Sequence, residues 1–337
     1  YRLLLERGIL RVQLPVPPGA EFNVVSVVNP YGCGDPSNLS MYRRPLPAAN
    51  LRFLTTVMWD GRESSVQTGT QSITYATNPA DLRADLAHQA LDATMGHAQG
   101  PALSPEQQQA IAEFESGLVT AQAYDYKAGF LDAGGANGGP EALASKTLPA
   151  FFVGINDPLN GNPRGVPYTS VIFDLFDAWQ KRHGDSPRAS IVRGQALFNS
   201  KLITISDVAG LNDALNVPNF EGTCGTCHSS PDVGNHSLSV PLNIGVANVD
   251  SPLDVSYLPV FTLQNKATGQ IVTTTDPGRA LITGAWKDIG KVKGPVLRGL
   301  ASRAPYFHNG SAQSLGDVVE FYDQRFHIHF TPQEKKD

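Results

Sequence analysis

The chain has 337 residues, enough for one large domain or two average ones, and only 17% of them are charged, against about 25% in a typical soluble protein. Its formal net charge is −5 and no run of five like charges occurs. This excludes a protein that binds nucleic acid through a basic surface, or a membrane through a polybasic segment. No stretch approaches 18 uninterrupted apolar residues, so no membrane-spanning helix is predicted, and the 32 glycines and 25 prolines indicate long ordered loops.

The first part of the chain predicts short strands followed by two capped helices. Runs typical of strands occur at 9–12 and 22–25. Asn78 and Ser104 are each followed by proline and then by apolar residues at helical spacing, which predicts two helix starts. The glycine-rich run at 134–140 predicts a linker or flexible loop.

The rest of the chain predicts more helix, with one hairpin. Apolar residues at helical spacing predict a helix at 170–182, and Ser186 followed by proline predicts the start of another. The run at 216–222 is predicted to be a loop, and 258–275 a short hairpin with its turn near Thr268 and Gly269. A last helix is predicted to follow Ser314.

The main chemical motif is Cys224 and Cys227 with His228, in the run C-G-T-C-H. It is typical of c-type haem attachment, because two thiols at this spacing can form thioethers to one haem and place the histidine under the iron. One alternative is half of a zinc site, although the sequence offers no second pair at the required spacing. Another is a thioredoxin-type redox pair, which needs a preceding strand and a following helix. We expect one covalent haem c and, because this attachment is completed outside the cytoplasm, a periplasmic or otherwise exported protein.

Several segments around this motif resemble the bacterial dihaem cytochrome c peroxidase superfamily, which includes the MauG-type enzymes. Residues 193–199 (R-G-Q-A-L-F-N) resemble the helix before the family's C-terminal haem. Residues 294–300 (G-P-V-L-R-G-L) and 304–310 (A-P-Y-F-H-N-G) resemble its P-x-L-R-N and A-P-Y-F-H-D-G signatures. Residues 58–62 (M-W-D-G-R) resemble its F-W-D-G-R segment. The resemblance extends with gaps from about residue 40 to the C-terminus.

The helical signal and the resemblance together predict a mainly α fold of two cytochrome c-like domains, with long loops, a little β structure and an incomplete first domain. We expect a partial N-terminal domain of the peroxidatic type at 1–140 and a C-terminal cytochrome c domain at 141–337. The family has one haem per domain, whereas this chain has a single C-x-x-C-H motif, and Cys33 has neither a partner cysteine nor a following histidine. We expect the first haem motif upstream of Tyr1; the alternative is that this protein has lost it.

The resemblance also implies a second ligand of the haem iron. In the family this ligand lies 14 residues after the histidine of A-P-Y-F-H, as methionine in the peroxidases and tyrosine in the MauG branch. Counted from His308, that position is Tyr322, so His228 and Tyr322 are the implied iron ligands. A phenolate ligand stabilises ferric iron and lowers its reduction potential. Tyr322 fits a core position of the last helix equally well, and His308 is implied to lie near the haem without binding iron.

Two residues are catalytic candidates. Trp59 resembles the tryptophan that carries electrons between the family's two haems; the alternative is an aromatic side chain that fills a domain interface. The family's distal glutamate is not matched, and its position falls near His97. Histidine as a residue type exchanges protons readily near neutral pH, so this side chain can transfer protons to a bound peroxide. A surface histidine is the alternative for His97. His236 can approach the haem edge or make a structural hydrogen bond.

The function implied is a peroxidase-like haem oxidoreductase that reduces hydrogen peroxide or oxidises a substrate, with electrons passing through the C-terminal haem. The implied partners are a small redox protein as electron donor and a second copy of the chain in a homodimer. The family also binds calcium between its domains, which would place the ion near Arg303 and Pro305 here. The alternative function, favoured by the single haem motif, is a monohaem periplasmic electron-transfer cytochrome without catalytic activity.

Overall fold

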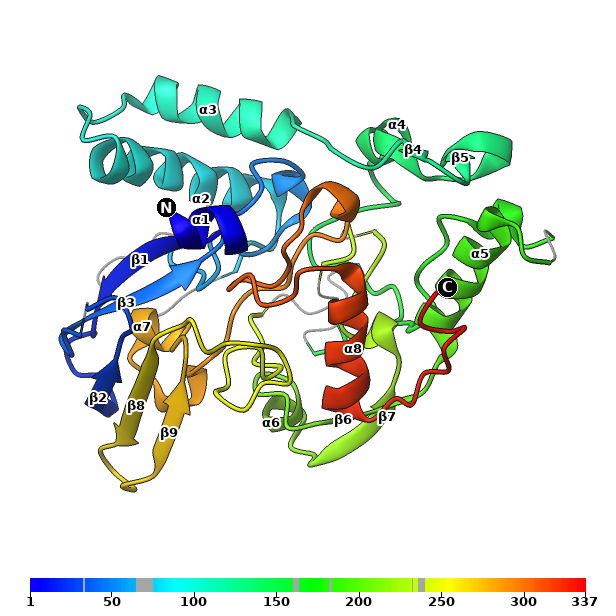
Figure 1. The fold of residues 1–337 in the computed structure, drawn as a ribbon. Helices are drawn as coiled ribbons and strands as arrows, with labels where there is room; N and C mark the ends of the chain where they lie inside the picture. Colours follow the sequence, from blue (N-terminus) through cyan, green and yellow to red (C-terminus); the bar gives the residue numbers. More distant parts are fainter. Residues whose placement is uncertain (33, 65–74, 160–163, 182–183, 232, 236–239) are drawn as a thin grey trace.

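The computed structural model describes residues 1–32, 34–64, 75–159, 164–181, 184–231, 233–235 and 240–337 (Figure 1). Of the described residues, 30% lie in helices and 16% in strands. The expectation of a mainly α fold of two cytochrome c-like domains is therefore wrong. The sequence analysis missed the strands at 38–43, 124–125, 129–130, 203–206 and 219–222, most of which are too short to show a clear alternating pattern. Cys33 and His236 lie outside the described residues.

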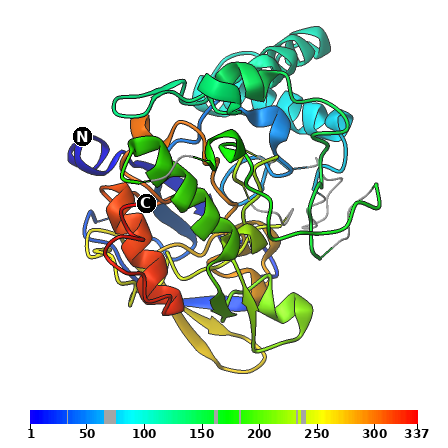
Figure 2. The same ribbon diagram turned by 90° about the vertical axis from the view of Figure 1, so that its right-hand side faces the viewer.

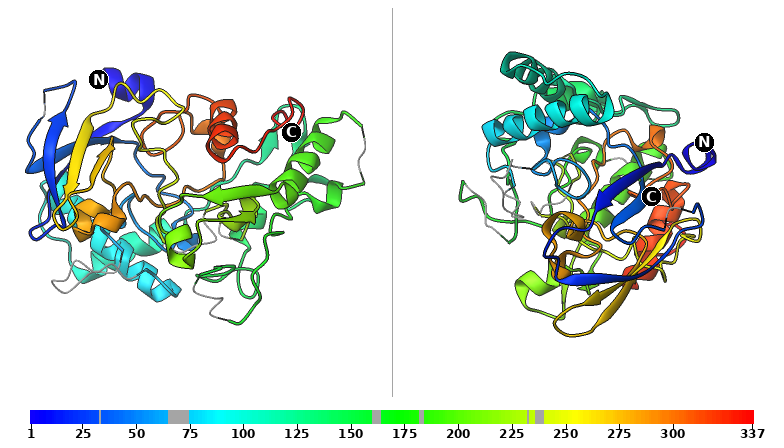
Figure 3. Two further views of the ribbon diagram at one scale, coloured as in Figure 1. Left: turned by 90° about the horizontal axis from the view of Figure 1, so that it is seen from below. Right: turned by 90° about the vertical axis from the view of Figure 1, so that its left-hand side faces the viewer.

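Antiparallel strands form two sheets at the end of the molecule opposite helix α5, as Figure 3 shows. Their bounds are β1 (Leu10–Pro15), β2 (Phe22–Val28), β3 (Asn38–Arg43), β8 (Val260–Asn265) and β9 (Ile271–Thr274). β1 pairs with β3, and the second sheet has the order β2-β8-β9, with Phe22 opposite Asn265. Phe22, Met41 and Phe261 are at most 1% exposed in the core between these strands. The hairpin predicted at 258–275 is confirmed as β8 and β9.

Two helices, α2 (Pro79–Asp92) and α3 (Pro105–Gly117), lie together along one side of the molecule (Figures 1 and 2). Both predicted starts are confirmed: the Asn78 side chain accepts hydrogen bonds from two backbone N–H groups, and Ser104 forms a capping box. Leu82, Leu86 and Ala112 are buried in one cluster between the two helices. A π-helical turn, η2 (Ala93–His97), follows α2 directly and ends at His97.

The remaining elements before residue 187 are short. They are α1 (Arg2–Arg7), η1 (Leu51–Phe53), β4 (Tyr124–Asp125), β5 (Gly129–Phe130), η3 (Ala133–Gly135), α4 (Gly139–Ala144) and η4 (Asp177–Trp179). The run at 134–140 includes part of η3 and the start of α4. The division into domains at residue 140 stays a prediction, and the sheet β2-β8-β9 joins strands from both sides of it.

The helix predicted at 170–182 is wrong, because a single turn, η4, forms there in the described residues. Polar side chains of α5 bind backbone groups of this segment, including the Phe173 carbonyl oxygen and the Phe176 N–H, which a helix would have paired. The Asn199 carbonyl accepts hydrogen bonds from the N–H groups of Ile172 and Phe173, and the Gln195 carbonyl accepts one from Phe176. Long-range hydrogen bonds therefore override the local helical pattern.

The C-terminal part combines helices with a hairpin. Its elements are α5 (Pro187–Ser200), β6 (Ile203–Ser206), α6 (Asn212–Leu215), β7 (Asn219–Gly222), η5 (Cys224–Thr226), α7 (Ala280–Thr283), η6 (Trp286–Asp288), η7 (Leu300–Ser302) and α8 (Leu315–Phe326). The predicted helix starts after Ser186 and Ser314 are confirmed by side-chain caps. Asp337 returns to α5, where it accepts hydrogen bonds from Ser190 and Arg193.

Candidate functional site

A cavity of about 1880 Å³ lies between α2, α5, β6, α8 and the loops that connect the sheets to them. This volume exceeds the roughly 300–1,000 Å³ of ordinary small-molecule pockets. Its lining includes all the predicted site residues, which are Trp59, His97, Cys224, Cys227, His228, His308 and Tyr322. The fold therefore brings together residues from four distant segments, although the chemical role of each stays a prediction.

The C-x-x-C-H motif forms a tight turn at the edge of this cavity. The run before it was predicted to be a loop, but residues 219–222 form β7, which leads into η5. The Cys224 carbonyl oxygen accepts hydrogen bonds from the N–H groups of Cys227 (3.2 Å) and His228 (3.0 Å). Gly225 packs so closely that a Cβ atom would overlap the Ser170 carbonyl oxygen. The turn thus holds both thiols and the imidazole within one short segment.

His228 is 8% exposed, and its environment determines which ring nitrogen carries the proton. Its Nδ1 atom lies 2.8 Å from the Gly234 carbonyl oxygen. A carbonyl oxygen only accepts hydrogen bonds, so Nδ1 donates and the lone pair lies on Nε2. Burial lowers the pKa of the imidazole, which favours this neutral form. A histidine held in this way has the tautomer that a metal ligand requires.

The two thiols differ from those of a redox pair. Cys224 and Cys227 are free, and burial raises the pKa of each to about 12. Thioredoxin-type pairs depend on the opposite shift, which stabilises the thiolate. Residues 229–231 and 233–235 form turns and bends rather than the helix that such a pair requires.

The geometry also disfavours a zinc site at the motif. Among the described residues, one group of three possible metal ligands has its ligand atoms within 4.8 Å of one another, and it consists of Glu63, His88 and Asp92. The two thiols and His228 do not form such a group. His88 Nδ1 lies 2.8 Å from Glu63 Oε2, which joins the 61–64 turn to α2. Of the three interpretations of the C-x-x-C-H run, covalent haem attachment fits this arrangement best.

Tyr322 reaches the cavity from α8. It packs in the same apolar cluster as both thiols, and its ring stacks on Phe326 with ring centroids 6.2 Å apart. Burial raises the pKa of its phenol well above the usual range, and the two nearby cysteines raise it further. Tyr322 and His228 thus line one cavity from separate segments.

Trp59 connects several segments around the cavity. Its Nε1 donates a hydrogen bond to the Arg44 carbonyl oxygen (2.7 Å), and its own carbonyl oxygen accepts one from the Lys293 N–H (2.8 Å). The Trp59 and His308 rings meet edge to face with centroids 6.0 Å apart. This contact joins the M-W-D-G-R segment to the A-P-Y-F-H-N-G segment.

His308 is 2% exposed and lies beside a buried ion-pair cluster. Arg43 pairs with Asp60 at 2.5 Å and with Asp276 at 2.6 Å. The Nε2 atom of His308 lies 3.7 Å from Asp276 and has no hydrogen-bond partner among the described residues. Burial lowers the pKa of His308 to about 4, so the ring is neutral at physiological pH.

His97 ends the π-helical turn η2 and is exposed at the cavity lining. Single π-helical turns within helices are frequent at functional sites. Its role in proton transfer stays a prediction.

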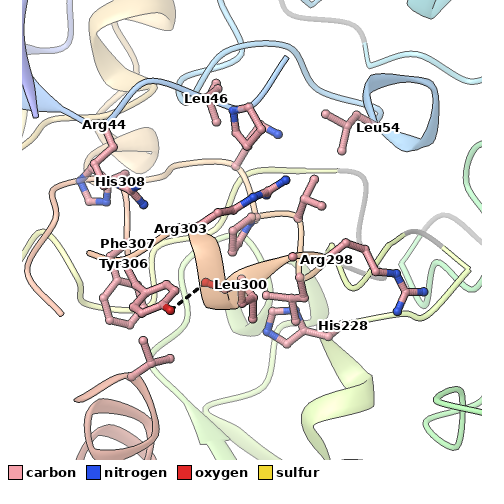
Figure 4. Close-up of a pocket in the computed structure, with 18 of the residues that line it drawn as sticks. Arg44, Leu46, Leu54, His228, Arg298, Leu300, Arg303, Tyr306, Phe307 and His308 are labelled. Carbon is pink, nitrogen blue, oxygen red and sulfur yellow. Dashed lines mark hydrogen bonds between the residues drawn. The ribbon is translucent and has the colours of Figure 1, made fainter. Parts of the chain in front are cut away.

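Sequence reasoning missed the basic residues of the cavity. Arg44, Lys293, Arg298 and Arg303 all line it, and Figure 4 shows the three arginines together with His228 and His308. Lys293 directly precedes the G-P-V-L-R-G-L run and Arg298 is its arginine. This position beside a recognised motif was the one signal in the sequence that could have marked them as site residues. Burial lowers the pKa of Lys293 to about 8 and that of Arg298 to about 10. Arg298 donates a hydrogen bond to the Ser230 carbonyl oxygen (3.0 Å).

These cations bear on the predicted calcium site. Burial and then the charge of Arg44 lower the pKa of Arg303, so two positive groups act on each other beside the expected carbonyl ligands. Calcium prefers several oxygen ligands of negative charge. The surroundings of Arg303 thus oppose a cation, and calcium stays a prediction that this geometry does not favour.

The residues of the cavity fit a haem group. The turn presents two thiols beside a histidine with the required tautomer, Tyr322 shares the lining, and the basic side chains of the lining suit the carboxylates that haem carries. Aromatic rings add apolar surface: Phe198 lies 5.9 Å from the His228 ring and Phe307 lies 6.4 Å from Tyr322, measured between centroids.

Comparisons with known proteins find cytochrome-c peroxidases. The chain is 31% identical over 157 residues to cytochrome-c peroxidase IdrP1 of Pseudomonas sp. (strain SCT), covering 44% of this chain and 35% of that protein. It is 30% identical over 179 residues to cytochrome-c peroxidase IdrP1 of Denitromonas iodatirespirans, covering 48% and 42%. Cytochrome-c peroxidase IdrP2 of the Pseudomonas strain is 32% identical over 110 residues, covering 31% and 29%.

The chain thus spans less than half the length of these curated relatives, and the similarity supports a cytochrome c peroxidase-like family over that part. No family model matches the chain, and no solved structure matches it. Within the described ranges, none of the helices is long and apolar enough to cross a membrane.

Proposed function

We propose that the chain is part of an exported c-type haem oxidoreductase of the peroxidase kind. Cys224 and Cys227 hold the haem covalently, and His228 and Tyr322 ligate its iron. The observation that carries this proposal is that the C-x-x-C-H turn and Tyr322, which lie on separate segments, line one cavity large enough for a haem. The similarity to cytochrome-c peroxidases over part of the chain supports it independently.

When bound, the haem supplies one-electron redox chemistry at its iron. The protein's own residues orient and tune it. The Gly234 carbonyl oxygen fixes the imidazole of His228, and the apolar cluster around Tyr322 excludes water from the phenol. Trp59, which hydrogen bonds hold to two segments, is the proposed carrier of electrons across the cavity.

His97 is the proposed proton-transfer group, acting on hydrogen peroxide, which is reduced, or on a separate substrate that is oxidised. It lies in the cavity lining at the end of a π-helical turn, where substrate can reach it from solvent. An imidazole can accept and donate a proton, which suits this role. A small redox protein is the proposed electron donor, and a tyrosine ligand of the iron is the feature that favours a MauG-like reaction on a substrate.

The second candidate function is a monohaem electron carrier, which the single C-x-x-C-H motif favours. Two measurements on the protein purified from its natural source separate the two. Intact mass under denaturing conditions counts covalent haems and gives the length of the polypeptide. A peroxide-consumption assay with a reduced redox donor then tests for catalysis.

Covalent haem with rapid peroxide consumption supports the peroxidase proposal. Covalent haem that exchanges electrons with the donor but does not consume peroxide supports the carrier. A protein without covalent haem overturns both.

A further inference from the structure

Three basic side chains of the cavity have no acidic partner among the described residues. They are Arg44, Lys293 and Arg303. Ion pairs of the described residues use other cations, such as Arg43 with Asp60 and Lys291 with Asp288. Lys293 is only 5% exposed, and the Nε atom of Arg44 is buried without a hydrogen-bond partner in the part of the chain that the structure describes.

The charge of Arg303 acts on Lys293, and the charge of Arg44 acts on Arg303. Burial and then the charge of Arg303 lower the pKa of Lys293 to about 8. Burial and then the charge of Arg44 lower the pKa of Arg303. Burying an ammonium group without a partner costs several kcal/mol, on the order of the stability of a whole domain. Such a cluster is stable when an anion compensates it.

The scaffold holds these groups in place. Trp59 bonds to the backbone of Arg44 at one end and of Lys293 at the other, with distances of 2.7 Å and 2.8 Å. Tyr306 donates a hydrogen bond of 2.8 Å to the Leu300 carbonyl oxygen, which closes the turn that precedes Arg303 (Figure 4). The segments that carry Arg44, Lys293 and Arg303 thus line the same cavity, and each contributes one basic side chain.

We infer that Arg44, Lys293 and Arg303 form an anion site that binds a carboxylate group inside the cavity. Guanidinium groups pair with carboxylates through two parallel hydrogen bonds, and the lysine adds a compact third charge. The carboxylate has two sources. If the carboxylate belongs to the haem, the inference rests on the proposed function. If the carboxylate belongs to a free organic acid, the inference is independent of the proposed function.

The test uses the holoprotein, with Lys293→Met as the variant and Lys287→Met, at an exposed position on η6, as the matched control. If the haem supplies the carboxylate, infrared spectra of protein carrying ¹³C-labelled haem carboxylates show a shifted carboxylate band in Lys293→Met and an unchanged band in Lys287→Met. Wild-type protein then binds no acetate in calorimetry, because the site is filled.

If a free acid supplies the carboxylate, wild-type protein binds acetate, and Lys293→Met weakens that binding at least about tenfold, which is about 1.4 kcal/mol. Lys293→Arg, which keeps the charge, restores either signal. Arg303→Gln serves as the second variant where Lys293→Met does not fold.

The inference is overturned if folded Lys293→Met and Arg303→Gln both leave the carboxylate band unshifted and wild-type protein binds no acetate. It is also overturned if Lys287→Met produces the same changes as Lys293→Met. A preparation whose mass shows no covalent haem contradicts the proposed function alone, and its acetate titration still tests the anion site.

Discussion

The imidazole Nδ1 of His228 lies 2.8 Å from the carbonyl oxygen of Gly234, six residues further along the chain. The loop that makes this contact depends on glycine: Gly234 has a φ of 78°, and a Cβ atom there would overlap the Leu297 side chain. The orientation of the proposed iron ligand is therefore set by close packing between the C-x-x-C-H loop and the G-P-V-L-R-G-L run.

Gly234→Ala should lower the free energy of unfolding by about 2–4 kcal/mol, because the left-handed backbone and the overlap with Leu297 both oppose a side chain. Gly19→Ala is the matched control, since Gly19 has a φ of 77° and open space around its Cβ position. It should cost about 1–2 kcal/mol. Denaturant unfolding of both variants measures the difference. Equal losses would show that Leu297 leaves room for a methyl group.

Tyr322→Phe should change the ferric absorption and electron paramagnetic resonance spectra while haem remains covalently attached, because the phenol is the proposed iron ligand. The reduction potential should rise, since a phenolate stabilises ferric iron. Tyr126→Phe, at a residue that is 93% exposed, is the control and should match wild type. If the ferric spectra of Tyr322→Phe are identical to those of wild type, Tyr322 does not bind iron and serves only in the packing of α8.

Trp59→Phe should slow peroxide-dependent turnover at least about tenfold without changing the haem content, because it removes the indole and its hydrogen bond to the Arg44 carbonyl oxygen. Steady-state rates with a reduced donor, together with haem quantification, test this. Trp286→Phe removes an indole that packs against the β-sheet core instead, and should leave turnover unchanged. Normal turnover in Trp59→Phe would leave Trp59 with a packing role.

Local signals in the sequence predicted local structure well. The caps at Asn78, Ser104, Ser186 and Ser314 each start a helix, because capping needs only residues within one turn. The hairpin of β8 and β9 is confirmed for the same reason. The helix predicted at 170–182 failed because Asn199 and Gln195, from a different helix, bind its backbone.

The candidate site was predictable where a motif spans few residues and not where it depends on the fold. Cys224, Cys227 and His228 carry their own spacing, and Tyr322 entered through the resemblance. The sequence could not predict the basic cluster of Arg44, Lys293 and Arg303, because no local pattern shows that three cations separated in the sequence line the same cavity. The mainly α fold failed because strands such as β3, β6 and β7 were not predicted. The pairing of β2 with β8 across more than 230 residues, with Phe22 opposite Asn265, also has no local signal.

His308 should make the stability of the protein sensitive to acid. Its pKa is about 4 in the folded protein, because burial opposes the charge, and about 6.5 in an unfolded chain. Between these values the unfolded state binds more protons, so the free energy of unfolding falls as the pH decreases, by up to about 3 kcal/mol at pH 4. Arg43 opposes protonation and Asp276 favours it, and the pKa of about 4 already includes both charges.

His308→Gln should therefore unfold with a weaker pH dependence between pH 6.5 and 4, whereas His329→Gln, at an exposed position, should follow wild type. Denaturant unfolding across this range is the measurement, and a His308→Gln profile parallel to wild type would show that His308 does not titrate between the two states.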